Sequence, residues 1–192
     1  MDREPKFENN PQPEAEKDPW ELQELEQLKG EDRSAALIWE DENAKKFAEE
    51  NNLDLIELPP PIEEKPNRYI IAKKEKTANI LEEKVNVLSS GKISEKVKAL
   101  YSKIKEMSAA EATKFLIEQP FGDDGKESPE VAVIEGLMFG YKPCDVEYYV
   151  NTRYFGEEKH PDEDIGFEKY GYVVCKECAE KVKQQNYEEP VK

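Results

Sequence analysis

Soft metal ligands are scarce in this chain of 192 residues, which contains three cysteines and one histidine. Apolar residues make up 37% of the chain, below the roughly 45–50% of an average soluble domain. No apolar run approaches the roughly 18 residues of a membrane-spanning helix. The acidic, proline-rich start lacks the apolar stretch of a secretory signal. Because an odd number of cysteines fits poorly with a disulfide framework, we expect a reducing, cytoplasmic setting without membrane association.

Negative charge dominates the sequence, which has 44 Asp and Glu, 28 Lys and Arg, and a net charge of −16. Such a chain repels nucleic-acid phosphate, so direct nucleic-acid binding is not expected. Only residues 68–119 carry an excess of basic side chains, eleven against seven acidic ones. The acidic surface attracts a basic protein partner, mimics nucleic acid at a partner's binding site, or only keeps the protein soluble. Composition leaves these three interpretations open.

The chain divides into three parts by composition. Residues 1–17, rich in Pro, Glu and Asn, are predicted to be a disordered acidic tail. Residues 18–119 are expected to form an α/β and helical region, which starts with a helix carrying Trp20, Leu25 and Leu28. This helix either docks on the body or is a short recognition helix for a partner, and docking is the preferred interpretation. Residues 120–192 are expected to form a helical hairpin followed by a C-terminal element that can bind zinc.

The predicted fold class is α+β, with a small β-sheet and helices, then a helical region, then a C-terminal C-x-x-C strand-turn-helix element. Apolar runs predict strands at residues 34–39, 53–58 and 68–74, with a helix capped by Asp41 between the first two. We expect a sheet of three strands with helices on one face. No Gly-rich turn joins strand to helix here, so nucleotide binding is not predicted.

Helical periodicity begins at Thr77 and continues to Gln119, where Ser108-Ala109-Ala110-Glu111 forms a capping box. Residues 128–153 then resemble a helix-turn-helix, with Gly136 at the expected close crossing of the two helices. The second helix carries Asp145 and Glu147 where base-contacting side chains would lie, which argues against DNA recognition. A hairpin that completes the core is therefore the preferred interpretation.

Every cysteine and histidine lies within one window of 35 residues, as Cys144, His160, Cys175 and Cys178. Three thiolates and one imidazole are a standard tetrahedral zinc set. Cys175-Lys176-Glu177-Cys178 lies between a strand candidate, residues 170–174, and a helix start, where the helix N-terminus stabilises thiolates. We predict that these four residues bind a structural zinc ion.

Three other interpretations of the cysteines stay open. In the first, the cysteines are ordinary buried thiols beside a surface histidine. In the second, an aspartate completes the metal-binding set in place of His160. The third interpretation is that the cysteines serve a thiol-dependent enzyme, because the order strand, C-x-x-C, helix is the local order of a thioredoxin active site. Only 14 residues follow Cys178, however, which is too few for the strands that follow that motif in a thioredoxin fold.

The segment Phe139-Gly140-Tyr141-Lys142-Pro143-Cys144-Asp145-Val146-Glu147-Tyr148-Tyr149 resembles one from a family of uncharacterised, mainly archaeal proteins. That family has a Gly-Tyr-x-Pro-Cys-x-Val-Glu segment, in which a turn leads into a helix start. Asp145 stands where the family pattern has a second cysteine. The family has no established activity, so the resemblance implies no site residue.

The sequence as a whole predicts a non-enzymatic, acidic interaction protein with a structural metal site and a protein partner. A nucleic-acid-mimicking inhibitor of a basic protein and a thiol-dependent enzyme are the alternatives. No catalytic residue is predicted, because no histidine or carboxylate has the spacing of a metalloprotease or deaminase site.

Overall fold

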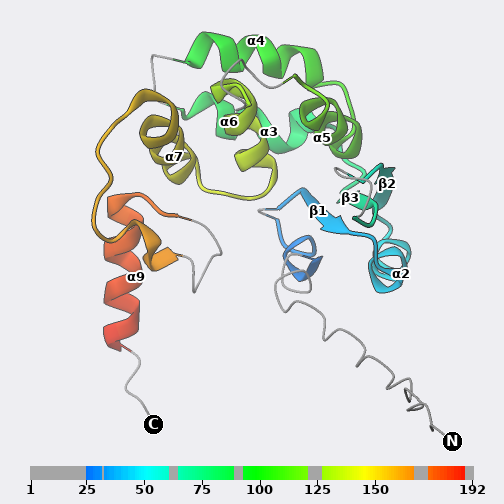
Figure 1. The fold of residues 1–192 in the computed structure, drawn as a ribbon, viewed down its shortest axis with the longest axis horizontal. Helices are drawn as coiled ribbons and strands as arrows, with labels where there is room; N and C mark the ends of the chain where they lie inside the picture. The colour runs from blue at the N-terminus through cyan, green and yellow to red at the C-terminus, as the bar shows by residue number, and fades with distance from the viewer. Residues whose placement is uncertain are drawn as a thin grey trace, which may run out of the picture.

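The computed structural model describes residues 25–31, 33–60, 65–88, 93–120, 127–166 and 173–188 (Figure 1). The elements in chain order are β1 (Ala35–Trp39), α2 (Glu42–Glu50), β2 (Asp54–Leu58), β3 (Arg68–Ala72), α3 (Thr77–Asn86), α4 (Ser94–Ile104), α5 (Ala109–Ile117), α6 (Pro129–Met138), α7 (Pro143–Phe155), the 3-10 helix η1 (Glu163–Gly166) and α9 (Lys176–Glu188). The predicted α+β class is confirmed. The predicted tail, residues 1–17, lies outside the described residues.

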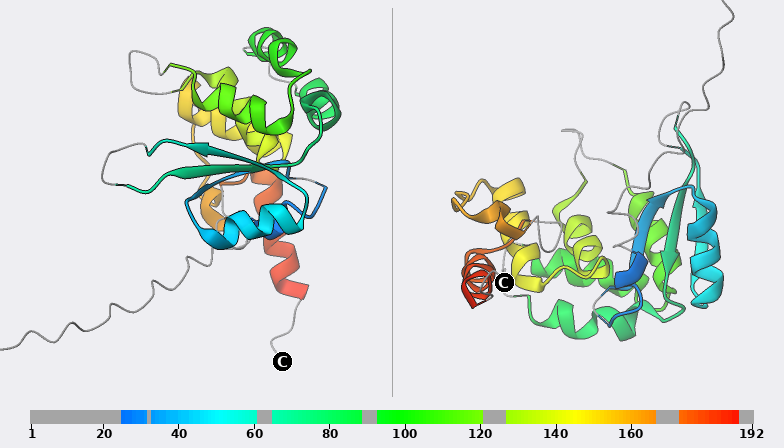
Figure 2. Two further views of the ribbon diagram at one scale, coloured as in Figure 1. Left: turned by 90° about the vertical axis from the view of Figure 1, so that its right-hand side faces the viewer. Right: turned by 90° about the horizontal axis from the view of Figure 1, so that it is seen from below.

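The sheet has three antiparallel strands with β3 in the centre. In register, Ile70 of β3 lies opposite Leu37 of β1 and Ile56 of β2. The prediction that helices cover one face is wrong, because α2 packs on one face and α5 on the other (Figure 2). Burial of both faces explains why the central strand is apolar at consecutive positions, Tyr69 to Ala72, instead of alternating.

The smaller of the two sheet-facing cores lies between β1, β3 and α2, and it includes Ala44 and Ala48. Asp41 caps α2 as predicted, because its side chain accepts the Asn43 backbone N–H at 2.8 Å. Leu25 and Leu28 are buried in the same core. The expected docking of the N-terminal helix is therefore confirmed for these two residues.

The larger core fills the space between the other sheet face and α3 to α7. Ser108 and Glu111 form the predicted capping box at the start of α5. Helix α6 is buried along most of its length, and it crosses α7 at Gly136. A Cβ atom at Gly136 would lie 2.9 Å from Val146 Cγ2, so the close crossing requires glycine as predicted. The hairpin of α6 and α7 thus completes the core.

Helix α9 lies at the opposite end of the molecule from α2 (Figures 1 and 2). It follows residues 173–175, which are not in a strand, while residues 170–172 of the predicted strand lie outside the described residues. Within the described part of the chain, no helix is both long and apolar enough to cross a membrane. Helix α9 packs against η1, and its start lies next to the start of α7.

Candidate metal centre

Two helix starts converge at the C-terminal end of the molecule. Helix α7 begins with Pro143 and carries Cys144 and Asp145 in its first turn. Cys175 directly precedes α9, and Cys178 lies in the first turn of α9. The ligand atoms of these three thiols and one carboxylate all lie within 4.8 Å of one another. Because a helix N-terminus carries partial positive charge, both helices stabilise anionic ligands at this point.

Direct contacts tie the two helix starts together. The Sγ atoms of Cys144 and Cys178 are 3.7 Å apart. The backbone N–H of Cys175 donates to Asp145 Oδ1 at 2.8 Å. The same oxygen lies 3.8 Å from Cys144 Sγ. Asp145 therefore faces the sulfur atoms with one oxygen and holds the chain at the start of α9.

Asp145 is buried, with 2% of the residue exposed. Its second oxygen, Oδ2, is shielded from solvent and has no hydrogen-bond partner among the described residues. A buried carboxylate with an unsatisfied oxygen is costly unless a cation or a donor compensates it. A metal ion among the three sulfur atoms would supply that positive charge. Three thiolates and one carboxylate form a donor set that zinc accepts in tetrahedral geometry, so the residues present fit such an ion.

Cys175 and Cys178 are poor nucleophiles in the metal-free protein. Burial raises the pKa of Cys175 to about 11, and the hydrogen bond and charge of Asp145 raise it further. Burial and the Asp145 charge also raise the pKa of Cys178. Both thiols are therefore protonated at neutral pH in the metal-free protein, and a bound metal must displace their protons.

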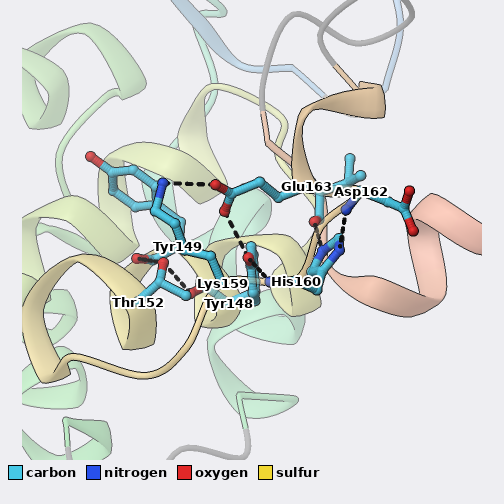
Figure 3. Close-up of polar contacts among 8 residues, drawn as sticks. Tyr148, Tyr149, Thr152, Lys159, His160, Asp162 and Glu163 are labelled. Atoms are coloured by element: carbon cyan, nitrogen blue, oxygen red, sulfur yellow. Dashed lines mark hydrogen bonds and ion pairs between the residues drawn. The ribbon is translucent and has the colours of Figure 1, made fainter.

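His160 lies outside this cluster. Its Nδ1 atom accepts the backbone N–H of Asp162 at 3.3 Å (Figure 3). Its Nε2 atom is 2.8 Å from the Val174 carbonyl oxygen. Because Nδ1 accepts, Nε2 carries the proton and donates it to that carbonyl. The structure thus brings Cys144, Cys175 and Cys178 together with Asp145, and it does not bring His160 to them.

His160 belongs to a network that supports the centre instead. The Glu163 carboxylate accepts the Tyr148 hydroxyl and the Lys159 ammonium, each at 2.7 Å (Figure 3). The Glu163 carbonyl accepts the Val174 backbone N–H at 3.0 Å. The Val174 carbonyl is therefore bound by His160, in the loop before η1, and the Val174 N–H is bound by Glu163 of η1. Since Val174 directly precedes Cys175, this network positions the first thiol of the C-x-x-C pair.

Sequence reasoning did not identify Asp145 as the carboxylate of the cluster. The aspartate that was expected as an alternative fourth ligand had no position assigned to it, and Asp145 was predicted to lie on the helix face that would contact bases. The available signal was an acidic residue next to a cysteine in the first turn of a helix that starts with proline. Tyr148 and Glu163 gave no signal, because their contact joins segments 15 residues apart through a loop.

Comparisons of the chain with protein-family models, with curated proteins and with solved structures find no match. The local resemblance of residues 139–149 therefore adds no ligand or partner. What the centre can do follows from its own residues: it can hold a thiophilic cation at the junction of α7 and α9.

Proposed function

We propose that this protein is a non-enzymatic interaction protein whose C-terminal helix is fixed by a structural zinc ion. The proposed ligands are Cys144, Asp145, Cys175 and Cys178. The observation that carries the proposal is the convergence of their ligand atoms, from two helix starts, within 4.8 Å of one another. Four protein ligands fill a tetrahedral zinc shell and leave no open position for a substrate, as is typical of structural sites.

A structural metal ion would stabilise the C-terminal element, because the apolar core of this element is small. Among the described residues, its cluster has Val174, Cys178 and Ala179 as buried members, with Ile165 and Cys175 packed against them, and Val182 of α9 is also buried. Cores of this size contribute too little free energy to order a helix on their own, and a structural metal is a common substitute. A zinc ion would also close the loop between Cys144 and Cys175.

Two observations favour an interaction role over the alternatives. The raised pKa values of Cys175 and Cys178 disfavour a thiolate nucleophile. Lysines pair with neighbouring carboxylates on several helices, as in Lys46–Glu50, Lys114–Glu118 and Lys183–Asp162. Such interspersed charge disfavours a continuous acidic face of the kind that mimics nucleic acid. The net charge of −16 still favours a basic protein as the partner.

The zinc proposal is tested by metal analysis of protein purified without chelators, followed by replacement with Co²⁺. We expect one zinc per chain and, with cobalt, a thiolate charge-transfer band and the strong visible bands of tetrahedral coordination. Cys178→Ser should abolish stoichiometric binding, and Asp145→Asn should weaken it. His160→Gln is the matched control, because it keeps a donor for Val174 and removes no proposed ligand.

Absence of both zinc and a cobalt spectrum in the wild-type protein would overturn the metal proposal. A loss of stoichiometric binding in His160→Gln as complete as that in Cys178→Ser would replace Asp145 by His160 as the fourth ligand. The charge-transfer band should have the intensity of three bound thiolates with either fourth ligand, so the fourth ligand is identified by which variant, Asp145→Asn or His160→Gln, loses binding.

A further inference from the structure

A cavity of about 310 Å³ lies between α6 and α7, beside the metal centre. Three aromatic side chains line it, Phe139, Tyr141 and Tyr149. Aliphatic groups of Ala132, Val146 and Val173 also line it. We call this space the α6–α7 cavity. Its volume is at the lower end of the range for ligand sites, about 300–1,000 Å³, so it suits a group the size of one amino-acid side chain.

Three carboxyl groups line the same cavity, those of Glu127, Glu135 and the proposed metal ligand Asp145. The carboxyl groups of Glu127 and Glu135 interact directly and form a pair. The Tyr154 hydroxyl donates to Glu127 Oε1 at 3.3 Å. Burial, followed by the negative charge of Glu127, raises the pKa of Glu135 to about 8. No lysine or arginine is among the described residues that line the cavity. The pair therefore has a neighbouring hydroxyl but no internal cation to neutralise it.

We propose that the α6–α7 cavity binds an organic cation, namely the ammonium or guanidinium end of a lysine-like or arginine-like group. The carboxyl pair would accept charge-assisted hydrogen bonds from that group. The faces of aromatic rings attract cations, most strongly where water is excluded. The aliphatic lining suits the alkyl stem that carries the charge. The same carboxylates repel phosphates and other anions.

The cation has two sources, a basic side chain of a protein partner or a free small amine. The first source rests on the proposed interaction function. In that case, a lysine or arginine side chain of the protein partner enters this cavity. The second source does not depend on that function. Both share one chemistry, so the cavity itself is tested first with small cations.

The test is a titration of the zinc-loaded full chain, followed by backbone amide NMR. The probes are n-butylammonium, n-butylguanidinium and the neutral isostere n-butanol. We expect both cations to shift the amides around Gly136, Phe139 and Tyr149, and butanol to bind at least about tenfold more weakly. This comparison needs no variant, so it stands even where a substitution perturbs folding.

Two double variants distinguish cation binding in the cavity from nonspecific attraction of cations to the negative charge of the protein. Glu127→Gln/Glu135→Gln should lower cation affinity by about tenfold or more. Glu49→Gln/Glu95→Gln replaces two carboxyl groups at exposed positions in the same way and should leave the affinity unchanged. Equal binding of butanol and butylammonium would overturn the proposal, and so would an equal loss in both double variants.

A further arm identifies the source and separates this inference from the zinc proposal. A Gly/Ser peptide with one central lysine or arginine is compared with the same peptide carrying norleucine. Binding of the basic peptides supports a protein partner, and binding of the free cations alone supports a small amine. No cation binding by protein with the full cobalt spectrum would overturn the cavity proposal and leave the metal proposal intact. Cation binding by a wild-type protein that shows neither zinc nor a cobalt spectrum would overturn the metal proposal and leave the cavity proposal intact.

Discussion

The body of the molecule and its C-terminal element are held together in different ways. Among the described residues, the larger core of the body joins 22 buried side chains from the sheet and α3 to α7. The cluster beside α9 contains three. Hydrophobic burial, at about 25 cal/mol per Å², can stabilise the first and not the second. The C-terminal element relies instead on polar contacts to α7 and on the proposed metal. Loss of a contact should therefore have regional consequences that depend on where it lies.

The largest expected effect on global stability comes from the body. Leu137→Ala removes a fully buried side chain of α6 and should lower the free energy of unfolding by about 2–5 kcal/mol. Because the body does not depend on metal, the loss should be the same with and without a chelator. Chemical denaturation followed by far-UV circular dichroism measures it. A loss that appears only in zinc-loaded protein would contradict the separation of the two regions.

Acid and alkali should act oppositely on the zinc-loaded and metal-free C-terminal element. Metal binding displaces thiol protons, so apparent affinity should fall as pH falls, by up to about tenfold per pH unit for each proton released. In the metal-free protein the folded pKa of Cys175 is raised to about 11 from an ordinary value of 9.0. That contribution to stability is complete below the ordinary pKa and is lost as pH rises toward 11.

Cobalt titrations across neutral pH measure the first effect. Amide exchange of α9 in chelated protein, extended to alkaline pH, measures the second. The same dependence of stability on pH in both forms would contradict thiolate ligation.

A smaller effect is expected from the network that supports Cys175. Tyr148→Phe removes the hydroxyl that donates to Glu163 at 2.7 Å, at a cost of about 1–3 kcal/mol for the partner left unsatisfied. The cost should appear as faster exchange of the amides at residues 173–178 and as weaker metal binding. Tyr101→Phe is the control, since this tyrosine is also partly buried but packs against the body core. Equal exchange at residues 173–178 in the two variants would remove Tyr148 from the support of the centre.

Local signals in the sequence predicted the body well, because its elements obey local rules. The Ser108 capping box is formed as expected, and Gly156 ends α7 with a positive φ of 71°. The two covered faces of the sheet were not predicted. Residues 68–74 were predicted to form one strand, and β3 spans Arg68–Ala72 within them. The reason for its unbroken apolar run depends on which helices pack on each face of the sheet.

The candidate site was predictable in composition and not in geometry. The C-x-x-C pair and Cys144 could be found by residue type alone, since the chain has three cysteines. The choice between His160 and an aspartate depends on how the segment between α7 and α9 folds back. That path is fixed by contacts such as His160 to Val174 and Tyr148 to Glu163, which no local pattern encodes.

Hydrogen–deuterium exchange of the full chain, zinc-loaded and after chelation, tests the central claim most directly. Zinc removal should lower the protection against exchange of the amides of α9 and of the first turn of α7. The amides of β3 and α6 should stay protected. Restoring one equivalent of zinc should restore the protection in wild-type protein and in His160→Gln, but not in Cys178→Ser. Equal protection of α9 with and without zinc would contradict the account.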